Sequence, residues 1–218
     1  MRHARPLPSY LIKRYHGWKA TEYEENKAWF QRLADEGQRP RAMVVSCCDS
    51  RLQVSALFGA EQGEFFIHRN IANLVPPHEP DGEHHGTSAT IEYAVRDLKV
   101  AHLIVIGHSK CGGIKGCAEI CANEHGAARP DDVYLTRWLE LLRPAWKRVR
   151  EAGIEDEEER LHRLEKEGVI VSLENLMTFP FVRRAVEEEA LQIHGLWTDI
   201  GAGDLEWFDP EAGEFVSL

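Results

Sequence analysis

The 218-residue sequence lacks several features that would place it in a specialised class of protein. No apolar stretch approaches the ~18 residues of a membrane-spanning helix, so we expect no membrane association. Cysteines are few: an odd five without a secretory signal disfavour disulfides and favour a reducing, cytoplasmic compartment. Basic residues are a minority, 26 against 36 acidic ones, and the net charge of −10 disfavours nucleic-acid binding. We therefore expect a globular protein that acts on a small molecule.

Short apolar runs alternate with amphipathic segments along the chain. The predicted strands are 42–48, 64–68 and 100–106, with a terminal hairpin over 196–200 and 205–208. The predicted helices begin at Thr21, at Thr87 or Ser88, at Asp131 or Asp132 (with a break at Pro144) and near Phe181. This order is typical of an α/β fold with a central, mostly parallel sheet flanked by helices. We divide the chain into an N-terminal helical arm, 1–37, and one α/β domain, 38–218.

Two of the predicted strands end in residues that can bind metal. Cys47 and Cys48 close the first, and His108 and Cys111 follow the strand over 100–106. Ligand sites in parallel sheets lie where the strands end, so these side chains are expected to meet. Imidazole and thiolate both bind zinc, and three protein ligands with one open position are typical of catalytic zinc. The residues alone leave open which of the adjacent thiols would bind, or whether both are buried small side chains.

Asp49 and Arg51 directly follow the first cysteine pair. The carboxylate would serve as a fourth ligand or as a hydrogen-bond acceptor beside the metal, and the guanidinium two residues later is placed to hold it. The alternative is an ordinary surface ion pair.

These residues resemble the signature of the β-class carbonic anhydrases, C-x-D-S-R and H-x-x-C-G-G. The two motifs stand here over 47–51 and 108–113, with further similarity at 68–77, 91–95 and 172–182. The resemblance implies reversible hydration of CO₂ to bicarbonate and a proton, by a hydroxide that zinc generates from water. It assigns Cys47, His108 and Cys111 as the ligands of Zn²⁺, and leaves Cys48 as a packed thiol.

The resemblance also implies roles for residues around the metal. Asp49 accepts a hydrogen bond from the reacting water, and Arg51 orients Asp49. Gln38, Phe66, Ile71 and Tyr93 match the substrate pocket of the plant-type subgroup, and the N–H of Gly112 is expected to be a further donor to the substrate. Since the matching glutamine reaches across a subunit interface, a homodimer or homotetramer is expected.

Three alternatives remain at this point. The same scaffold would suit hydrolysis of CS₂ or COS, or a non-catalytic protein in which Asp49 closes the zinc site. Cys117 and Cys121 suggest a second metal or redox site, although buried helix positions are favoured for both. The charged segment 155–167 is expected to be a solvated helix face.

Overall fold

The computed structural model describes residues 4–81, 85–122 and 133–218. It contains two compact units, Met1–Gln38 and Arg39–Leu218. No helix in the described ranges is both long and apolar enough to cross a membrane.

The first unit is helical. Helix α1 spans Ser9–Trp18 and continues through a π-helical segment, Lys19–Tyr23, and α2 spans Lys27–Glu36. The predicted helix start at Thr21 is wrong, because the Thr21 hydroxyl donates to the carbonyl of Gly17, one turn earlier in a helix already formed. The rings of Trp18, Tyr23 and Phe30 pack together, with centroids 5.4 to 5.7 Å apart.

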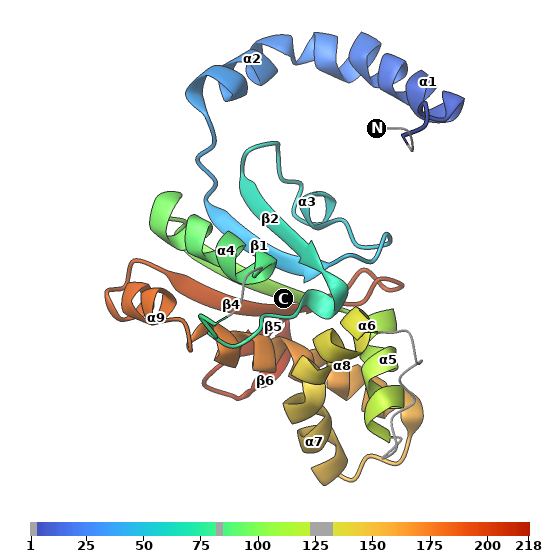
Figure 1. Cartoon of the computed structure of the whole chain (residues 1–218), viewed down its shortest axis with the longest axis vertical. Helices are drawn as coiled ribbons and strands as arrows, with labels where there is room; N and C mark the ends of the chain where they lie inside the picture. The colour runs from blue at the N-terminus through green and yellow to red at the C-terminus, as the bar shows by residue number, and fades with distance from the viewer. Residues whose placement is uncertain (1–3, 82–84, 123–132) are drawn as a thin grey trace. The chain divides into compact units, whose positions relative to one another are not determined.

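The second unit is built on a six-stranded sheet in the order β2-β1-β3-β4-β5-β6 (Figure 1). The strands are β1 (Ala42–Cys47), β2 (Phe65–Asn70), β3 (His102–His108), β4 (Gln192–Thr198), β5 (Leu205–Asp209) and β6 (Glu214–Ser217). The first four strands of the chain pair in parallel, and β5 and β6 add antiparallel neighbours. The expected mostly parallel sheet and terminal hairpin are confirmed.

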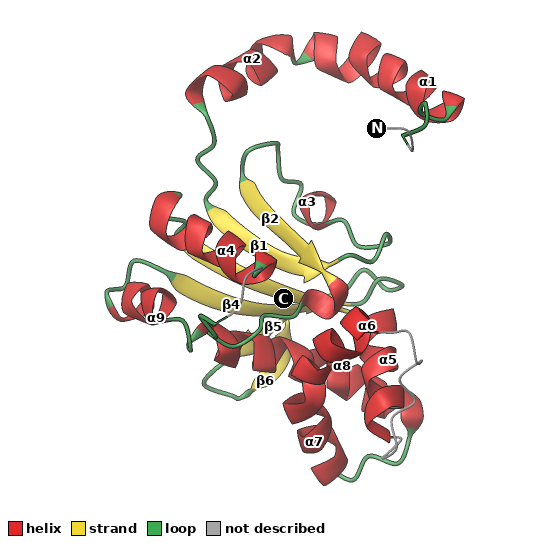
Figure 2. Cartoon of the chain, viewed as in Figure 1, coloured by secondary structure: helices red, strands yellow, loops and turns green. Residues whose placement is uncertain are grey.

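Helices surround this sheet (Figure 2). They are α3 (Val54–Leu57), α4 (Gly86–Glu92), α5 (Gly112–Ala122), α6 (Val133–Leu139), α7 (Arg143–Glu151), α8 (Glu157–Leu176) and α9 (Pro180–Glu187), with 3₁₀ turns at Ile71–Asn73 and Glu140–Leu142 and a π-helical segment at Tyr93–Asp97. Pro144 lies in the first turn of α7, after the 3₁₀ turn that separates it from α6, so the predicted break is confirmed. The helix start predicted at Asp131 or Asp132 lies outside the described residues.

Two apolar clusters hold these layers together. One joins Met43 and Val105 of the sheet to α4, α8 and α9, and the other joins Val44 and Ile106 to α5, α7 and α8. All six residues of β1 are buried because its alternate side chains pack into the two clusters, which cover both faces of the strand. The ends of β1 and β3 are therefore held rigidly.

The charged segment 155–167 is a solvated helix face only in part: residues 155–159, 162 and 163 are exposed, as expected, but two glutamates further along α8 are not. Glu165 and Glu167 are buried beside Leu164 and Val169. Glu167 accepts hydrogen bonds from Arg148 and Arg163, which compensate its burial. Glu165 has different partners, described below.

Candidate metal centre

The sheet brings the two cysteine- and histidine-bearing segments together at one edge. β1 and β3 are parallel neighbours, paired up to Ser46 and Ile106. Cys47 is the last residue of β1, His108 is the last residue of β3, and Cys111 follows just before α5. Parallel strands place their carboxyl ends side by side, which is why residues 64 positions apart in the chain meet here.

Cys47, His108 and Cys111 form a compact group of metal-ligating atoms. The two sulfurs and a ring nitrogen lie within 4.8 Å of one another, and all three residues are buried. The two Sγ atoms are 3.9 Å apart, close to the ~3.8 Å expected for two thiolates ~2.3 Å from one tetrahedral zinc. Zinc therefore fits this donor set.

The histidine presents the correct nitrogen to this group. His108 Nδ1 lies 2.9 Å from the carbonyl oxygen of Ser109 and can donate to it. Nε2 is buried and has no hydrogen-bond partner. A buried, unpaired acceptor costs free energy, and a cation bound between Nε2 and the sulfurs removes that cost. The arrangement is that of a metal-ligating histidine whose other nitrogen is held by a carbonyl.

The two thiols have unequal acidities. A hydrogen bond with Cys111 lowers the pKa of Cys47 to about 4 against the opposing effect of burial, and the nearby His108 ring and the backbone of Asp49 act in the same direction. The same Cys47 contact raises the pKa of Cys111. Thiolates are the metal-binding form of cysteine, so a bound cation would displace any proton that remains on the pair.

Asp49 lies beside the group and is held by Arg51. Arg51 Nε donates to Oδ1 at 2.9 Å and Nη2 donates to Oδ2 at 2.7 Å. These hydrogen bonds keep the pKa of Asp49 well below its usual range, so the carboxyl is ionised. Oδ2 is 4.0 Å from His108 Nε2. Arg51 also donates to the carbonyl of Lys110 at 3.0 Å, and thereby links the two ligand-bearing segments.

Arg69, on β2, is a residue that the sequence analysis missed. Its guanidinium donates to the carbonyls of Cys47 at 2.8 Å, Asp49 at 2.7 Å and Leu52 at 2.9 Å. These bonds fix the chain between the first ligand and α3. Arg69 lies inside the 68–77 stretch, but its role depends on carbonyl directions that a sequence does not reveal.

The residues assigned to the substrate pocket fall into separate places. Ile71 is 40% exposed and lines a cleft of about 790 Å³ together with Cys48, His68 and Trp138. Cys48 is exposed, so its interpretation as a packed thiol is wrong; β1 ends at Cys47, and strand alternation no longer applies to the next residue.

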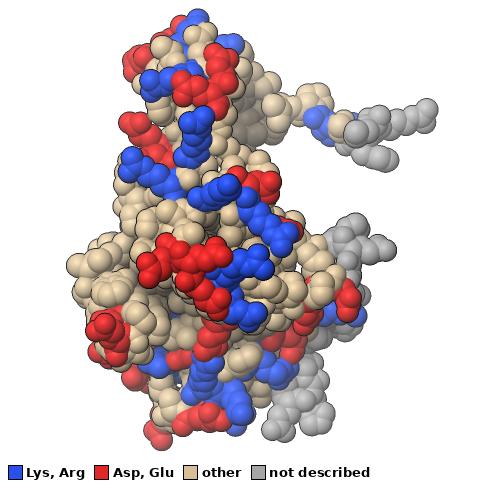
Figure 3. Space-filling model, turned by 90° about the vertical axis from the view of Figure 1, so that its left-hand side faces the viewer, with Lys and Arg blue, Asp and Glu red and all other residues tan. Residues whose placement is uncertain are grey.

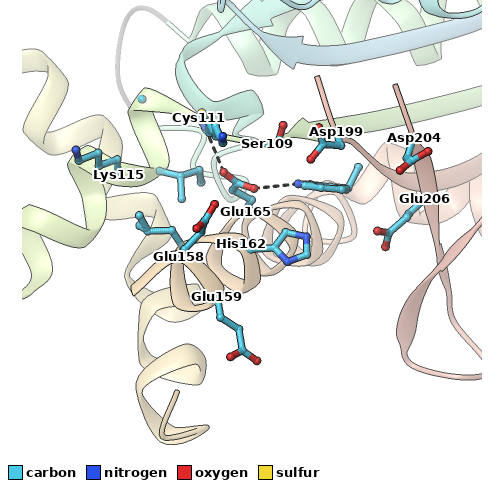
Figure 4. A pocket seen from close by; sticks show the side chains of 15 residues that line it. Ser109, Cys111, Lys115, Glu158, Glu159, His162, Glu165, Asp199, Asp204 and Glu206 are labelled. Atoms are coloured by element: carbon cyan, nitrogen blue, oxygen red, sulfur yellow. Dashed lines mark hydrogen bonds between the residues drawn. The ribbon is translucent and has the colours of Figure 1, made fainter. Parts of the chain in front are cut away.

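Phe66 and Tyr93 are not among the residues that line this cleft. They form a ring pair with centroids 5.8 Å apart. Gly112, at the start of α5, lines another cavity, of about 590 Å³ (Figure 4). Gln38 belongs to the first unit.

Cys117 and Cys121 are buried in α5, with their sulfurs 3.7 Å apart. Among the described residues they do not belong to any group of three potential metal ligands. They pack in the apolar cluster beneath α5, as expected for core positions.

Comparison with known proteins is consistent with this site. A family model described as carbonic anhydrase matches residues 42–205. The curated β carbonic anhydrase 3 of Arabidopsis thaliana is 36% identical over 193 residues, which cover 88% of this chain and 73% of that protein.

The solved structures that resemble this chain are also β-carbonic anhydrases. The β-carbonic anhydrase CcaA has a TM-score of 0.88 at 25% identity, over 96% of this chain and 91% of its own. A tetrameric β-carbonic anhydrase of Sordaria macrospora has a TM-score of 0.77 at 34% identity, over 91% and 95% of the two chains. CafA of Aspergillus fumigatus has a TM-score of 0.78 at 31% identity, over 94% and 93%.

Proposed function

Because this chain belongs to the β class of the carbonic anhydrase family and is therefore a carbonate dehydratase, a lyase, we propose that Cys47, His108 and Cys111 hold its catalytic zinc. The observation that carries this assignment is the convergence of two buried sulfurs on the unpaired Nε2 of His108. Zinc bound there would act as a Lewis acid and lower the pKa of a coordinated water from 15.7 to about 7.

Asp49 and Arg51 are the side chains that would orient the reacting water. We propose that Asp49 Oδ2 accepts a hydrogen bond from the reacting water and turns its lone pair toward the carbon of CO₂. Arg51 occupies both carboxylate oxygens from one side, which keeps Asp49 ionised and in one orientation. The same contacts oppose the movement by which Asp49 would close the metal site, so they disfavour a purely structural zinc protein.

The substrate site requires a small apolar slot, because CO₂ carries no charge. Ile71 is supported as part of it, since Ile71 lines the cleft beside Cys48. We propose that Phe66, Tyr93, Gln38 and the N–H of Gly112 complete the slot in a homo-oligomer, a dimer or a tetramer. The tetrameric Sordaria relative supports this assembly. No observation favours CS₂ or COS as the substrate.

We further propose that the enzyme acts in the cytoplasm and that residues 38–218 form its catalytic domain. All five cysteines are free thiols, which suits a reducing compartment.

Stopped-flow CO₂ hydration at pH 8.5, with zinc quantified in the same samples, tests the site. Wild-type protein should contain one zinc per chain and be active. Asp49→Asn should keep its zinc and lose activity by about 10²-fold or more, because an amide nitrogen cannot accept the hydrogen bond. The control is Asp209→Asn, whose carboxylate accepts from the N–H groups of Glu211 and Ala212 in its own turn; it should be fully active. Zinc-loaded wild-type protein without activity would instead indicate a structural metal.

A further inference from the structure

Glu165 is a buried acidic residue beside the metal centre that none of the roles proposed above uses. It belongs to α8 and is 5% exposed. It lines the cavity of about 590 Å³ that also includes Cys111 and Trp197 (Figure 4). A carboxyl group is costly to bury, and burial raises the pKa of Glu165. Apolar packing alone would be better served by an aliphatic side chain, so the contacts of Glu165 require an explanation.

Both oxygens of Glu165 accept hydrogen bonds. Oε1 accepts from the backbone N–H of Cys111 at 3.2 Å, and Oε2 accepts from the indole N–H of Trp197 at 3.2 Å. The dashed lines in Figure 4 show these two bonds. One carboxylate thus connects α8 and β4 to the residue that carries a proposed zinc ligand.

Trp197 is itself held in place. The centroid of its ring lies 4.6 Å from that of His162, and Nζ of Lys166 lies 4.8 Å from the ring centroid, over its face. Lys166 forms an ion pair with Glu206 at 2.7 Å. These contacts hold the indole N–H in place against Glu165. The indole in turn helps to hold the Glu165 carboxylate against the N–H of Cys111.

We propose that Glu165 is a positioning residue for the Cys111 ligand: by holding the Cys111 N–H, it keeps the Cys111 sulfur beside Cys47 and His108. This inference rests on the zinc site proposed above. Residues behind metal ligands typically change metal affinity or activity by 10- to 100-fold when they are lost.

Glu165→Gln provides a nearly isosteric test. Whichever way the amide is turned, its NH₂ group faces an N–H donor, that of Cys111 or that of Trp197. The rate at which zinc passes to a chelator should rise about ten-fold, and the thiolate-to-cobalt absorption band of the Co²⁺ form should shift. The matched control is Glu167→Gln, since Glu167 is equally buried on α8 but is bonded to Arg148 and Arg163. It should release zinc at the wild-type rate.

Trp197→Phe distinguishes positioning from general packing. Alone, it should release zinc at a rate between those of wild type and Glu165→Gln, because Glu165 loses one of its two donors. Combined with Glu165→Gln, it should slow zinc release relative to Glu165→Gln, since the amide NH₂ no longer faces the indole. Lost packing alone would make the double variant worse.

The outcomes separate the two proposals. Wild-type protein that is active and zinc-loaded, with Glu165→Gln releasing zinc at the same rate, overturns only the role of Glu165. Wild-type protein that binds no zinc overturns both. Circular dichroism checks folding, and if Glu165→Gln does not fold, a wild-type release rate in Trp197→Phe overturns the inference.

Discussion

At the residue scale, the site is defined by the hydrogen bonds that its side chains have already made. Nδ1 of His108 lies against a carbonyl, and both Asp49 oxygens are bound by Arg51. What remains unpaired is Nε2 of His108, and two thiol sulfurs lie beside it. The atoms that the neighbours leave available are therefore one imidazole nitrogen and two sulfurs, a donor set that suits tetrahedral zinc.

The adjacent cysteines allow a prediction at this scale. Cys47 is buried within the ligand group, whereas Cys48 is exposed in the cleft. Cys47→Ser should lose most of its zinc, because a serine hydroxyl remains protonated and is a poor ligand. Cys48→Ser, the matched control, should keep one zinc per chain. Metal analysis after dialysis measures the zinc content of each variant. Loss of zinc in Cys48→Ser with retention in Cys47→Ser would show that Cys48 is the ligand instead of Cys47.

At the scale of elements, the strands and the ends that carry ligands were predictable because apolar runs bounded by Gly and Asp have few alternative structures. The burial of the acidic residues of α8 was not predicted. Val169 and Leu176 follow Glu165 by four and eleven residues, a helical spacing that places this glutamate on the buried face. The many charged residues of 155–167 favoured a solvated helix, although buried positions recur in it at helical spacing. The partners Trp197 and Arg69 depend on side-chain directions across separate elements, which no local pattern contains.

The packing of α5 against the 3₁₀ turn at Ile71–Asn73 gives a second prediction. A Cβ on Gly113 would lie 2.9 Å from Ile71 Cγ2 and 3.0 Å from Ala72 Cβ, whereas one on Gly112 would meet nothing within 4 Å. Gly113→Ala should therefore lower the free energy of unfolding by about 1–3 kcal/mol. Gly112→Ala, one position earlier in the same helix turn, should stay within ~0.5 kcal/mol of wild type. Urea unfolding measures both, and equal midpoints for the two variants would contradict the close packing.

At the scale of the whole molecule, charge and metal have different consequences. On the face shown in Figure 3, acidic and basic side chains are interspersed, so the net charge of −10 does not gather into one patch of a single sign there. Charges of both signs at close range largely cancel, so this face carries no strong field of one sign. The proposed zinc ligands, by contrast, connect the ends of two central strands with the start of α5. Metal binding should consequently raise the stability of the entire second unit.

Zinc removal tests that connection. A ligand that binds only the folded state, at 1,000 times its Kd, stabilises it by about 4.1 kcal/mol. At roughly 2–4 °C per kcal/mol for a chain of this size, Tm should fall by about 8–16 °C after chelation and recover when zinc is restored. Cys47→Ser should melt at the same temperature with and without zinc, because it lacks one of the two thiolates. If the melting temperature of wild-type protein does not change once metal analysis verifies that the zinc has gone, the three ligands do not contribute to its stability. The metal would then act on a framework that β1 and β3 complete without it, since their pairing and burial already fix where each ligand lies.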